Sequence, residues 1–216
     1  PFYDVFKLLK KEKMLVNRFQ NFYIHQFLLF MIFTGAMMFI GADMLLMVFS
    51  LTLAAIFFAL AGFSVDSPFS HTGGEREIIQ MMSYDPMIIL VPVGMYLATG
   101  TFRINEIAAS DKLLILYLPG IFIGYVYILT IKFRKSPFDL AMSHHAHQEI
   151  VKGLTTEYSG SALAEIEVAH WYENILLLGI VYLFFASVPV LGLVMVILFY
   201  LLEIFIDNTN ARVRWQ

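Results

Sequence analysis

Two long apolar runs decide the fold of this chain: residues 22–41 read FYIHQFLLFMIFTGAMMFIG, and residues 44–66 read MLLMVFSLTLAAIFFALAGFSVD. Only Ala42 and Asp43 separate the two runs, so we expect a tight turn at Asp43. A helix that crosses a bilayer needs about 20 mainly apolar residues, and both runs reach that length. The sequence therefore predicts two consecutive membrane-spanning helices joined by a very short connection.

Four more apolar runs follow, at about 86–103, 113–133, 168–186 and 187–207. We therefore expect an all-α integral membrane protein with about six transmembrane helices in one membrane domain over residues 1–216. The polar segments at about 1–21, 67–85 and 134–167 are predicted to be loops on the same side of the membrane. The third of these lies between the fourth and fifth helices and is long, which is typical of functional loops. Its Ala, Leu, Ile and Glu residues recur at helical spacing, so we expect short helices lying on the bundle.

The composition supports a membrane protein and excludes several classes of function. Hydrophobic residues make up 59% of the 216 residues and charged residues only 14%, whereas soluble domains are about half apolar and about a quarter charged. The net charge of -3 gives no basic surface for nucleic acid. The chain has no cysteine, so it cannot ligate an iron–sulfur cluster or supply a thiol nucleophile. We therefore expect a lipid bilayer around the chain and no redox cofactor bound to it.

Lysine and arginine are distributed very unevenly between the two sides of the predicted membrane domain. If the N-terminal segment lies in the cytoplasm, twelve of the fourteen Lys and Arg residues fall on that side, and only Arg103 and Lys112 fall on the other. Cytoplasmic loops carry an excess of these two residue types. The pattern predicts a multi-pass protein of the cytoplasmic membrane, with both ends of the given chain in the cytoplasm.

Three polar clusters lie on the side that receives the long loops. The first is GGERE at 73–77 with SYDP at 83–86, and it is either a solvated loop with an exposed ion pair or the mouth of an ion path. The second is SPFD at 136–139 with SHHAHQE at 143–149. Its three imidazoles and carboxylate suit metal binding, proton transfer near neutral pH, or a polar surface cap, and the spacing alone does not choose among them.

The third cluster begins with TEYSG at 156–160 and continues through Glu165 into the fifth apolar run. On a helix, Glu167, His170 and Glu173 step by three residues and share one face. Glu173 directly precedes Ile-Leu-Leu-Leu, and ionisable groups at membrane depth are functional candidates because they are costly to bury. Glu167 and His170 also match half of a di-iron site, but such a site needs two Glu-x-x-His pairs and the chain has one.

Together, these carboxylates and imidazoles favour a proton relay into the membrane. The candidate relay residues are Arg76, Glu77, Asp85, Asp139, His144, His145, His147, Glu149, Glu157, Glu165, Glu167, His170 and Glu173. No residue is assigned to catalysis, cofactor binding or metal binding. The residues alone indicate an ion-conducting or redox-coupled membrane subunit, and they leave open whether the transported ion is H⁺ or Na⁺.

Three stretches of the chain resemble the membrane subunit that docks the hydrophilic arm in respiratory complex I, the family of its H subunit, which has counterparts in energy-converting hydrogenases. These stretches are residues 1–12, residues 76–85 with Arg76, Gln80 and Ser83-Tyr84-Asp85, and residues 134–140 with SPFDL together with residues 149–160 with TEYSG. The resemblance spans nearly the whole chain. It implies a bundle of about eight helices, with further helices before Pro1 and after Gln216.

Several departures from the complex I pattern are similar to the membrane-bound [NiFe]-hydrogenase branch of the Ech/Mbh type. They are the histidine-rich segment 141–148, the triplet Ala169-His170-Trp171, and the closing stretch 206–212 with Asp207-Asn208 and Ala211-Arg212. This resemblance implies a ferredoxin-linked, ion-translocating hydrogenase complex. Its [NiFe] centre and iron–sulfur clusters would lie in large and small subunits docked on the cytoplasmic face, and its membrane neighbours would be antiporter-like subunits.

Three other functions remain open at this point. One is a complex I-type subunit that shapes a quinone site, which the histidine-rich insertion disfavours. Another is a stand-alone ion transporter, which usually has a site at the membrane midplane between related halves, and this sequence has no internal repeat. The third is a purely structural anchor, which leaves the acidic stripe around Glu173 unexplained.

Overall fold

The computed structural model describes residues 2–12, 17–134, 136–142 and 150–211, and every regular element within these ranges is a helix. The helices are α1 (Phe2–Leu9), α2 (Arg18–Ile40), α3 (Met44–Phe63), α4 (Pro68–Thr99), α5 (Ile104–Ala108), α6 (Leu114–Tyr117), α7 (Pro119–Lys132), α8 (Gly160–Phe184) and α9 (Pro189–Thr209), with one 3-10 turn, η2 (Gly153–Thr155). The expected all-α membrane architecture is confirmed.

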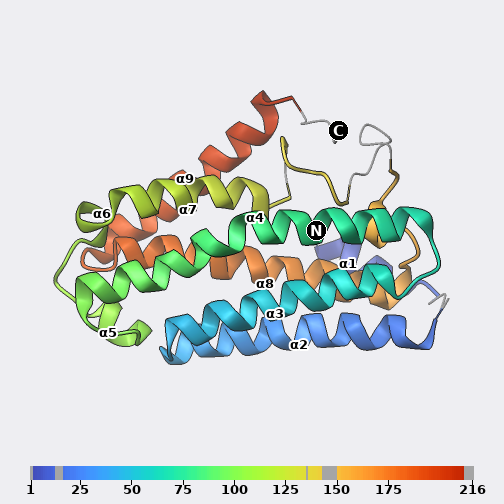
Figure 1. Ribbon diagram of the computed structural model, residues 1–216, viewed down its shortest axis with the longest axis horizontal. Coiled ribbons are helices and arrows are strands. Elements are labelled where there is room, and N and C mark those ends of the chain that lie inside the picture. Colours follow the sequence, from blue (N-terminus) through green and yellow to red (C-terminus); the bar gives the residue numbers. More distant parts are fainter. Residues whose placement is uncertain (1, 13–16, 135, 143–149, 212–216) are drawn as a thin grey trace.

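The turn between α2 and α3 forms as the sequence predicts. Gly41 ends α2 in the left-handed conformation at φ 76°, which favours glycine because it has no Cβ. Asp43 then caps α3, and its side chain accepts a hydrogen bond from the Leu46 N–H at 3.0 Å. These two residues close the connection within three positions, so α2 and α3 pack side by side along their length (Figure 1).

Four helices within the described residues are long and apolar enough to cross a membrane, namely α2, α3, α4 and α9, and α7 is a shorter apolar helix. Of the six predicted spans, the first, second and last match α2, α3 and α9 closely, and the third lies in the second half of α4. The fourth, 113–133, is divided into α6 and α7 because Pro119 has no N–H to continue a helix and begins a new one. The fifth corresponds to α8, which also carries three glutamates.

The prediction of a loop over 67–85 was wrong. Residues 68–85 form the first half of α4, a helix of 32 residues that begins with Pro68 in its first turn. The polar residues in this half suggested a loop, but Arg76, Glu77 and Gln80 are buried. They find their partners in neighbouring segments, so the helix can continue through a stretch that is unusually polar for a membrane span.

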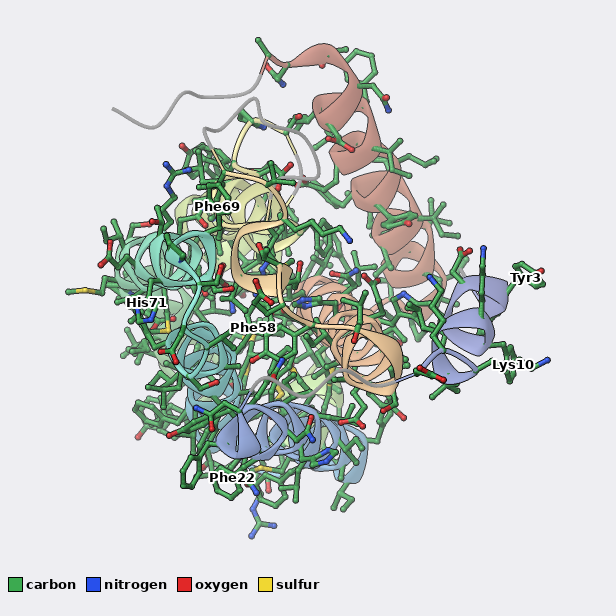
Figure 2. The ribbon with its side chains drawn as sticks, turned by 90° about the vertical axis from the view of Figure 1, so that its right-hand side faces the viewer. Tyr3, Lys10, Phe22, Phe58, Phe69 and His71 are labelled. Atoms are coloured by element: carbon green, nitrogen blue, oxygen red, sulfur yellow. The ribbon has the colours of Figure 1, made fainter. Side chains whose placement is uncertain are left out.

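Two other loop boundaries also differ from the prediction. Residues 2–9 of the expected N-terminal loop form α1, which packs beside α8. The side chains of Tyr3 in α1 and of Lys10 directly after α1 point away from the bundle (Figure 2). The long loop ends at Ser159 rather than at residue 167, because α8 begins at Gly160. Its described part holds only the turn η2 instead of the expected short helices.

The linker between α7 and α8 lies against α4, mainly through its backbone carbonyl groups. The Gln80 Nε2 donates to the Phe138 carbonyl at 3.0 Å, and the Arg76 Nη1 donates to the Leu140 carbonyl at 3.3 Å. Burial raises the pKa of Tyr158 to about 12, so its hydroxyl stays protonated and donates to the Ala61 carbonyl at 2.8 Å. Hydrogen bonds therefore hold the linker against the helices of the bundle.

Gly73 allows this close contact between α4 and the linker. A Cβ atom at position 73 would collide with the backbone nitrogen of Leu154. We expect Gly73→Ala to push η2 away and to destabilise the fold by about 1–3 kcal/mol, as overpacking does. Thermal unfolding in detergent would measure this loss. Gly120→Ala is the control because, apart from its chain neighbours and the backbone of its own helix, no atom lies within 4 Å of its added Cβ. Equal unfolding midpoints for the two variants would contradict the prediction.

The core lies between α2, α3, α4 and α8, and Phe58 of α3 is at its centre (Figure 2). The α9 helix is different, since it leaves the bundle at an angle and contacts mainly α8 and α7 (Figure 1). Only Gly192 and Glu203 of its 21 residues are buried. Most of its apolar surface therefore faces outward, toward lipid or a neighbouring protein.

Candidate functional site

Five titratable side chains meet inside the bundle at the end of α7, where the chain turns into the linker. They are Glu77 of α4, Lys132 of α7, Arg134 just after α7, and His170 and Glu173 of α8, and we call them the buried charge cluster. The side chains of Lys132 and Glu173 are 2% and 1% exposed. Charges this deep are costly unless they are paired and hydrogen-bonded.

Each charge in the cluster has a direct partner. The Lys132 Nζ lies 3.0 Å from the Glu173 Oε1. The Arg134 guanidinium bridges two helices, with Nη1 donating to the Glu173 Oε2 at 2.9 Å and Nη2 donating to the Glu77 Oε1 at 2.7 Å. Two cations thus balance two carboxylates. Burial acts to lower the pKa of Arg134, but the two carboxylates outweigh it and raise that pKa, so the guanidinium stays charged.

His170 makes two polar contacts at its Nδ1 atom that fit different positions of its proton. Its Nδ1 lies 2.9 Å from the Arg134 Nη1 and 3.3 Å from the Glu173 Oε2. Arginine only donates hydrogen bonds and a carboxylate only accepts them, so the Arg134 contact requires a bare Nδ1 and the Glu173 contact requires a protonated Nδ1. Neither His170 Nε2 nor Glu77 Oε2 has a hydrogen-bond partner among the described residues. Both atoms are buried, and each has hydrogen-bonding capacity that no described residue uses.

Each of the two cations contacts an aromatic ring, and the backbone of Arg134 is strained. The Lys132 Nζ lies 4.5 Å from the centroid of the Tyr84 ring, and the Arg134 Cζ lies 5.1 Å from that of Phe58, which are cation–π distances. The backbone of Arg134 is left-handed, at φ 50°. Residues other than glycine adopt this conformation at a cost, and such strain gathers at functional sites.

A polar cavity of about 360 Å³ adjoins the cluster. Its lining joins three of the predicted relay residues, Asp139, Glu167 and His170, to Lys132 and Arg134. The remaining lining residues are Phe133, Ser136, Met142, Trp171, Asn174 and Asp207. The Asp207 Oδ1 accepts a hydrogen bond from the Ser136 N–H at 2.8 Å, so α9 also helps to fix the start of the linker.

The structure therefore brings together part of the predicted relay. Glu77, His170 and Glu173 belong to the cluster, and Asp139 and Glu167 line the cavity beside it. Arg76 is buried against the linker rather than placed in a mouth. His144, His145, His147 and Glu149 lie outside the described residues. Within the part of the chain that is described, no three His, Asp or Glu side chains are arranged to hold a metal ion.

Three predicted relay residues make no hydrogen bond or ion pair with the cluster among the described residues. Asp85 is half-buried on α4. Glu157 is half-buried, and its backbone carbonyl accepts a hydrogen bond from Gln20. Glu165 pairs with His25 of α2 at 2.6 Å near the surface. The relay is thus more compact than the sequence suggests.

Sequence reasoning missed the two cations that complete the cluster. It used Lys132 and Arg134 as markers of the cytoplasmic side, and Arg134 also as the first residue of a stretch that resembles the family, but it assigned neither residue to the relay. Lys132 follows the apolar residues Ile128, Leu129 and Ile131 at the end of a predicted span. An ionisable residue in that position is a functional candidate, and this signal would have found Lys132.

Comparison with known proteins places the chain in a family. The sequence pattern of the family described as NADH dehydrogenase matches residues 1–216, the whole chain. The chain belongs to the NADH dehydrogenase family. It is 37% identical over 122 residues to the H subunit of NADH-quinone oxidoreductase from Dehalococcoides mccartyi strain CBDB1, covering 56% of this chain and 33% of that protein. It is 33% identical over 136 residues to hydrogenase-4 component C of Escherichia coli K12, covering 61% of this chain and 41% of that protein.

A solved structure shares the fold of this chain. A chain from the structure of the membrane-bound sulfane sulfur reductase, an archaeal respiratory membrane complex, superimposes with a TM-score of 0.85. The match covers 99% of this chain and 78% of that chain at 23% identity, so it establishes the fold. This member of the NADH dehydrogenase family is a multi-pass membrane protein, and its matched segments span about a third to two fifths of its curated relatives.

Proposed function

We propose that this chain is the membrane subunit of a ferredoxin-linked, ion-translocating [NiFe]-hydrogenase complex. It anchors a peripheral arm of large and small subunits and passes their redox change to antiporter-like membrane subunits as H⁺ or Na⁺ movement. The observation that carries the proposal is the buried charge cluster, which lies between α4, α7 and α8 directly beside the linker. The linker is the part of the described chain that we expect to contact the arm.

The burial of this cluster supports a functional role. Well-packed apolar residues often stabilise a fold as well as a buried ion pair does. A purely structural anchor would therefore gain little from two cations and two carboxylates at this depth. Ionisable groups within membrane proteins instead mark ion paths.

His170 offers a physical switch for the coupling. When the ring is neutral with its proton on Nε2, its Nδ1 accepts a hydrogen bond from Arg134. Protonation of Nδ1 would remove that acceptor and turn the ring into a donor toward Glu173. Arg134 would then lose one of its three contacts and shift toward Glu77. A proton arriving at His170 therefore rearranges the bridge between α4 and α8, which is the kind of two-state element that coupling requires.

The chemistry of the electron carriers must come from other subunits. The chain has no cysteine, and [NiFe] centres and iron–sulfur clusters need thiolate ligands. The residues of this chain therefore do not fit such groups. What they provide is the docking surface and the charged interior, and we derive no redox step within the chain.

The hydrogenase branch is supported by the relationship to hydrogenase-4 component C and by the residues Ala169-His170-Trp171 and Asp207-Asn208. A quinone-reducing complex is the second candidate. It is favoured by the relationship to the NADH-quinone oxidoreductases and by an apolar cavity of about 480 Å³ between α4 and α7, lined by residues such as Ile79, Met87 and Tyr127. Such a cavity suits an apolar ligand.

Metal analysis of the complex that co-purifies with this subunit in mild detergent separates the two candidates. We expect nickel at about one atom per complex, with a large excess of iron, because each cluster of the arm holds several irons. Iron without nickel would contradict the hydrogenase assignment and direct attention to bound quinone. A subunit that purifies alone, without either metal, and transports ions by itself would contradict both.

A further inference from the structure

The α9 helix turns a glutamate, rather than an apolar side chain, toward the bundle. Glu203 is 4% exposed, whereas its apolar neighbours Leu201 and Phe205 are 58% and 67% exposed. An apolar helix at the edge of a bundle normally buries its apolar stripe. The inward placement of Glu203 therefore needs an explanation, because a carboxyl group is among the costliest groups to place inside a membrane protein.

Glu203 lines a small cavity of about 220 Å³ together with Phe133, Asn174, Tyr200, Ile204 and Asp207. Its Oε1 has no hydrogen-bond partner among the described residues. Nor does any described cation pair with it, since Lys132 and Arg134 are bonded to Glu173 and Glu77. A buried carboxyl oxygen without a partner needs water or a proton, and a polar cavity of this size has room for water.

This cavity adjoins the polar cavity beside the buried charge cluster. The two share Phe133, Asn174 and Asp207 in their linings. Asn174 and Asp207 therefore lie at the boundary between the cavity lined by His170 and Glu167 and the smaller cavity lined by Glu203. The polar groups that line the smaller cavity together with Glu203 are the amide of Asn174, the hydroxyl of Tyr200 and the carboxylate of Asp207.

We propose that Glu203 is a proton-carrying group at the end of a hydrated passage that leads from the buried charge cluster to α9. An excess proton carried by water in the passage, as hydronium, would pass to the Glu203 carboxylate, so that one O–H bond of the hydronium breaks, a carboxyl O–H bond forms and neutral water remains. The carboxyl group would later give this proton to another water molecule, which becomes hydronium in turn. No oxidation or reduction is involved. This inference rests on the proposed ion-translocating function. It adds a specific proton-carrying residue, Glu203, and the path of the protons from the buried charge cluster toward α9.

The test uses the complete complex in liposomes and measures protons translocated per electron pair with a pH-sensitive dye. Glu203→Gln keeps the size of the side chain and removes its acid–base function. We expect the ratio to fall roughly tenfold or more, because a positioned proton-transfer group contributes about 10²–10⁴-fold. Glu203→Asp, which retains a carboxyl group, should recover part of the ratio. Asp111→Asn removes an exposed carboxylate between α5 and α6 and serves as the control.

A wild-type ratio in Glu203→Gln would overturn the inference. If Glu77→Gln still lowers the ratio in that case, the proposed function stands without a role for Glu203. If neither variant changes the ratio, both the inference about Glu203 and the proposed function fail. Should Glu203→Gln not assemble, Asn174→Leu decides, since it leaves Glu203 in place and puts an apolar side chain between the two cavities. A lowered ratio in Asn174→Leu supports the passage, and an unchanged ratio overturns it.

Discussion

Glu173→Leu is expected to destabilise the subunit by about 3–5 kcal/mol, the usual cost of removing one partner from a buried ion pair. Glu173 accepts hydrogen bonds from both Lys132 and Arg134. Its loss leaves the Lys132 ammonium buried without a counterion. Thermal unfolding of the complex in detergent, together with the amount of assembled complex in membranes, would measure the effect.

A second variant separates loss of charge balance from loss of packing. Lys132→Met combined with Glu173→Leu removes one cation and one carboxylate and leaves Arg134 paired with Glu77. We expect it to recover much of the stability, since replacing a buried pair with apolar residues is often neutral. Glu165→Leu, which breaks the half-exposed pair with His25, is the control and should cost at most about 1 kcal/mol. A double variant as unstable as Glu173→Leu would contradict the prediction.

Glu77→Gln is expected to uncouple ion movement from electron transfer. The amide oxygen can still accept the hydrogen bond from Arg134, so the fold should persist, but the cluster gains a net positive charge. It also loses the open Oε2, which has no partner among the described residues. We expect the number of ions translocated per electron pair to fall by roughly tenfold or more, as for loss of a positioned acid–base group.

The matched control for this variant is Glu75→Gln, because Glu75 lies two residues away on the same helix and is exposed. Its ratio of ions to electron pairs should match that of the wild type. The prediction fails if the two variants behave alike. It also fails if Glu77→Gln abolishes electron transfer and ion movement together in a correctly assembled complex, since Glu77 would then serve docking or structure.

Much of this architecture could be predicted from hydropathy alone. The runs at 22–41 and 44–66 and the turn at Asp43 correspond closely to α2, α3 and their connection. The first half of α4 could not be predicted in this way. Its polar residues are satisfied by carbonyls of the distant linker, such as those of Phe138 and Leu140, and a local pattern carries no record of such partners.

The site was predictable only in part, because a local sequence pattern shows which residues share a helix face but not which distant residues they contact. The spacing of Glu167, His170 and Glu173 identified one face of α8, because helical periodicity is a local property. The charge balance was not visible, since Lys132 and Arg134 reach Glu173 and Glu77 only in the folded bundle, where α7 packs against α4. The orientation of Glu203 shows the same limit, because the sequence marks a glutamate in an apolar run but does not say that its side chain faces the bundle.

The most direct test of the central claim is the ratio of ions translocated to electron pairs in the complex that carries Lys132→Met and Glu173→Leu. This variant keeps a balanced, folded interior but dismantles half of the buried charge cluster. We expect an assembled complex that still transfers electrons and moves few or no ions. A wild-type ratio would show that the cluster serves only the fold, and it would contradict the role in coupling.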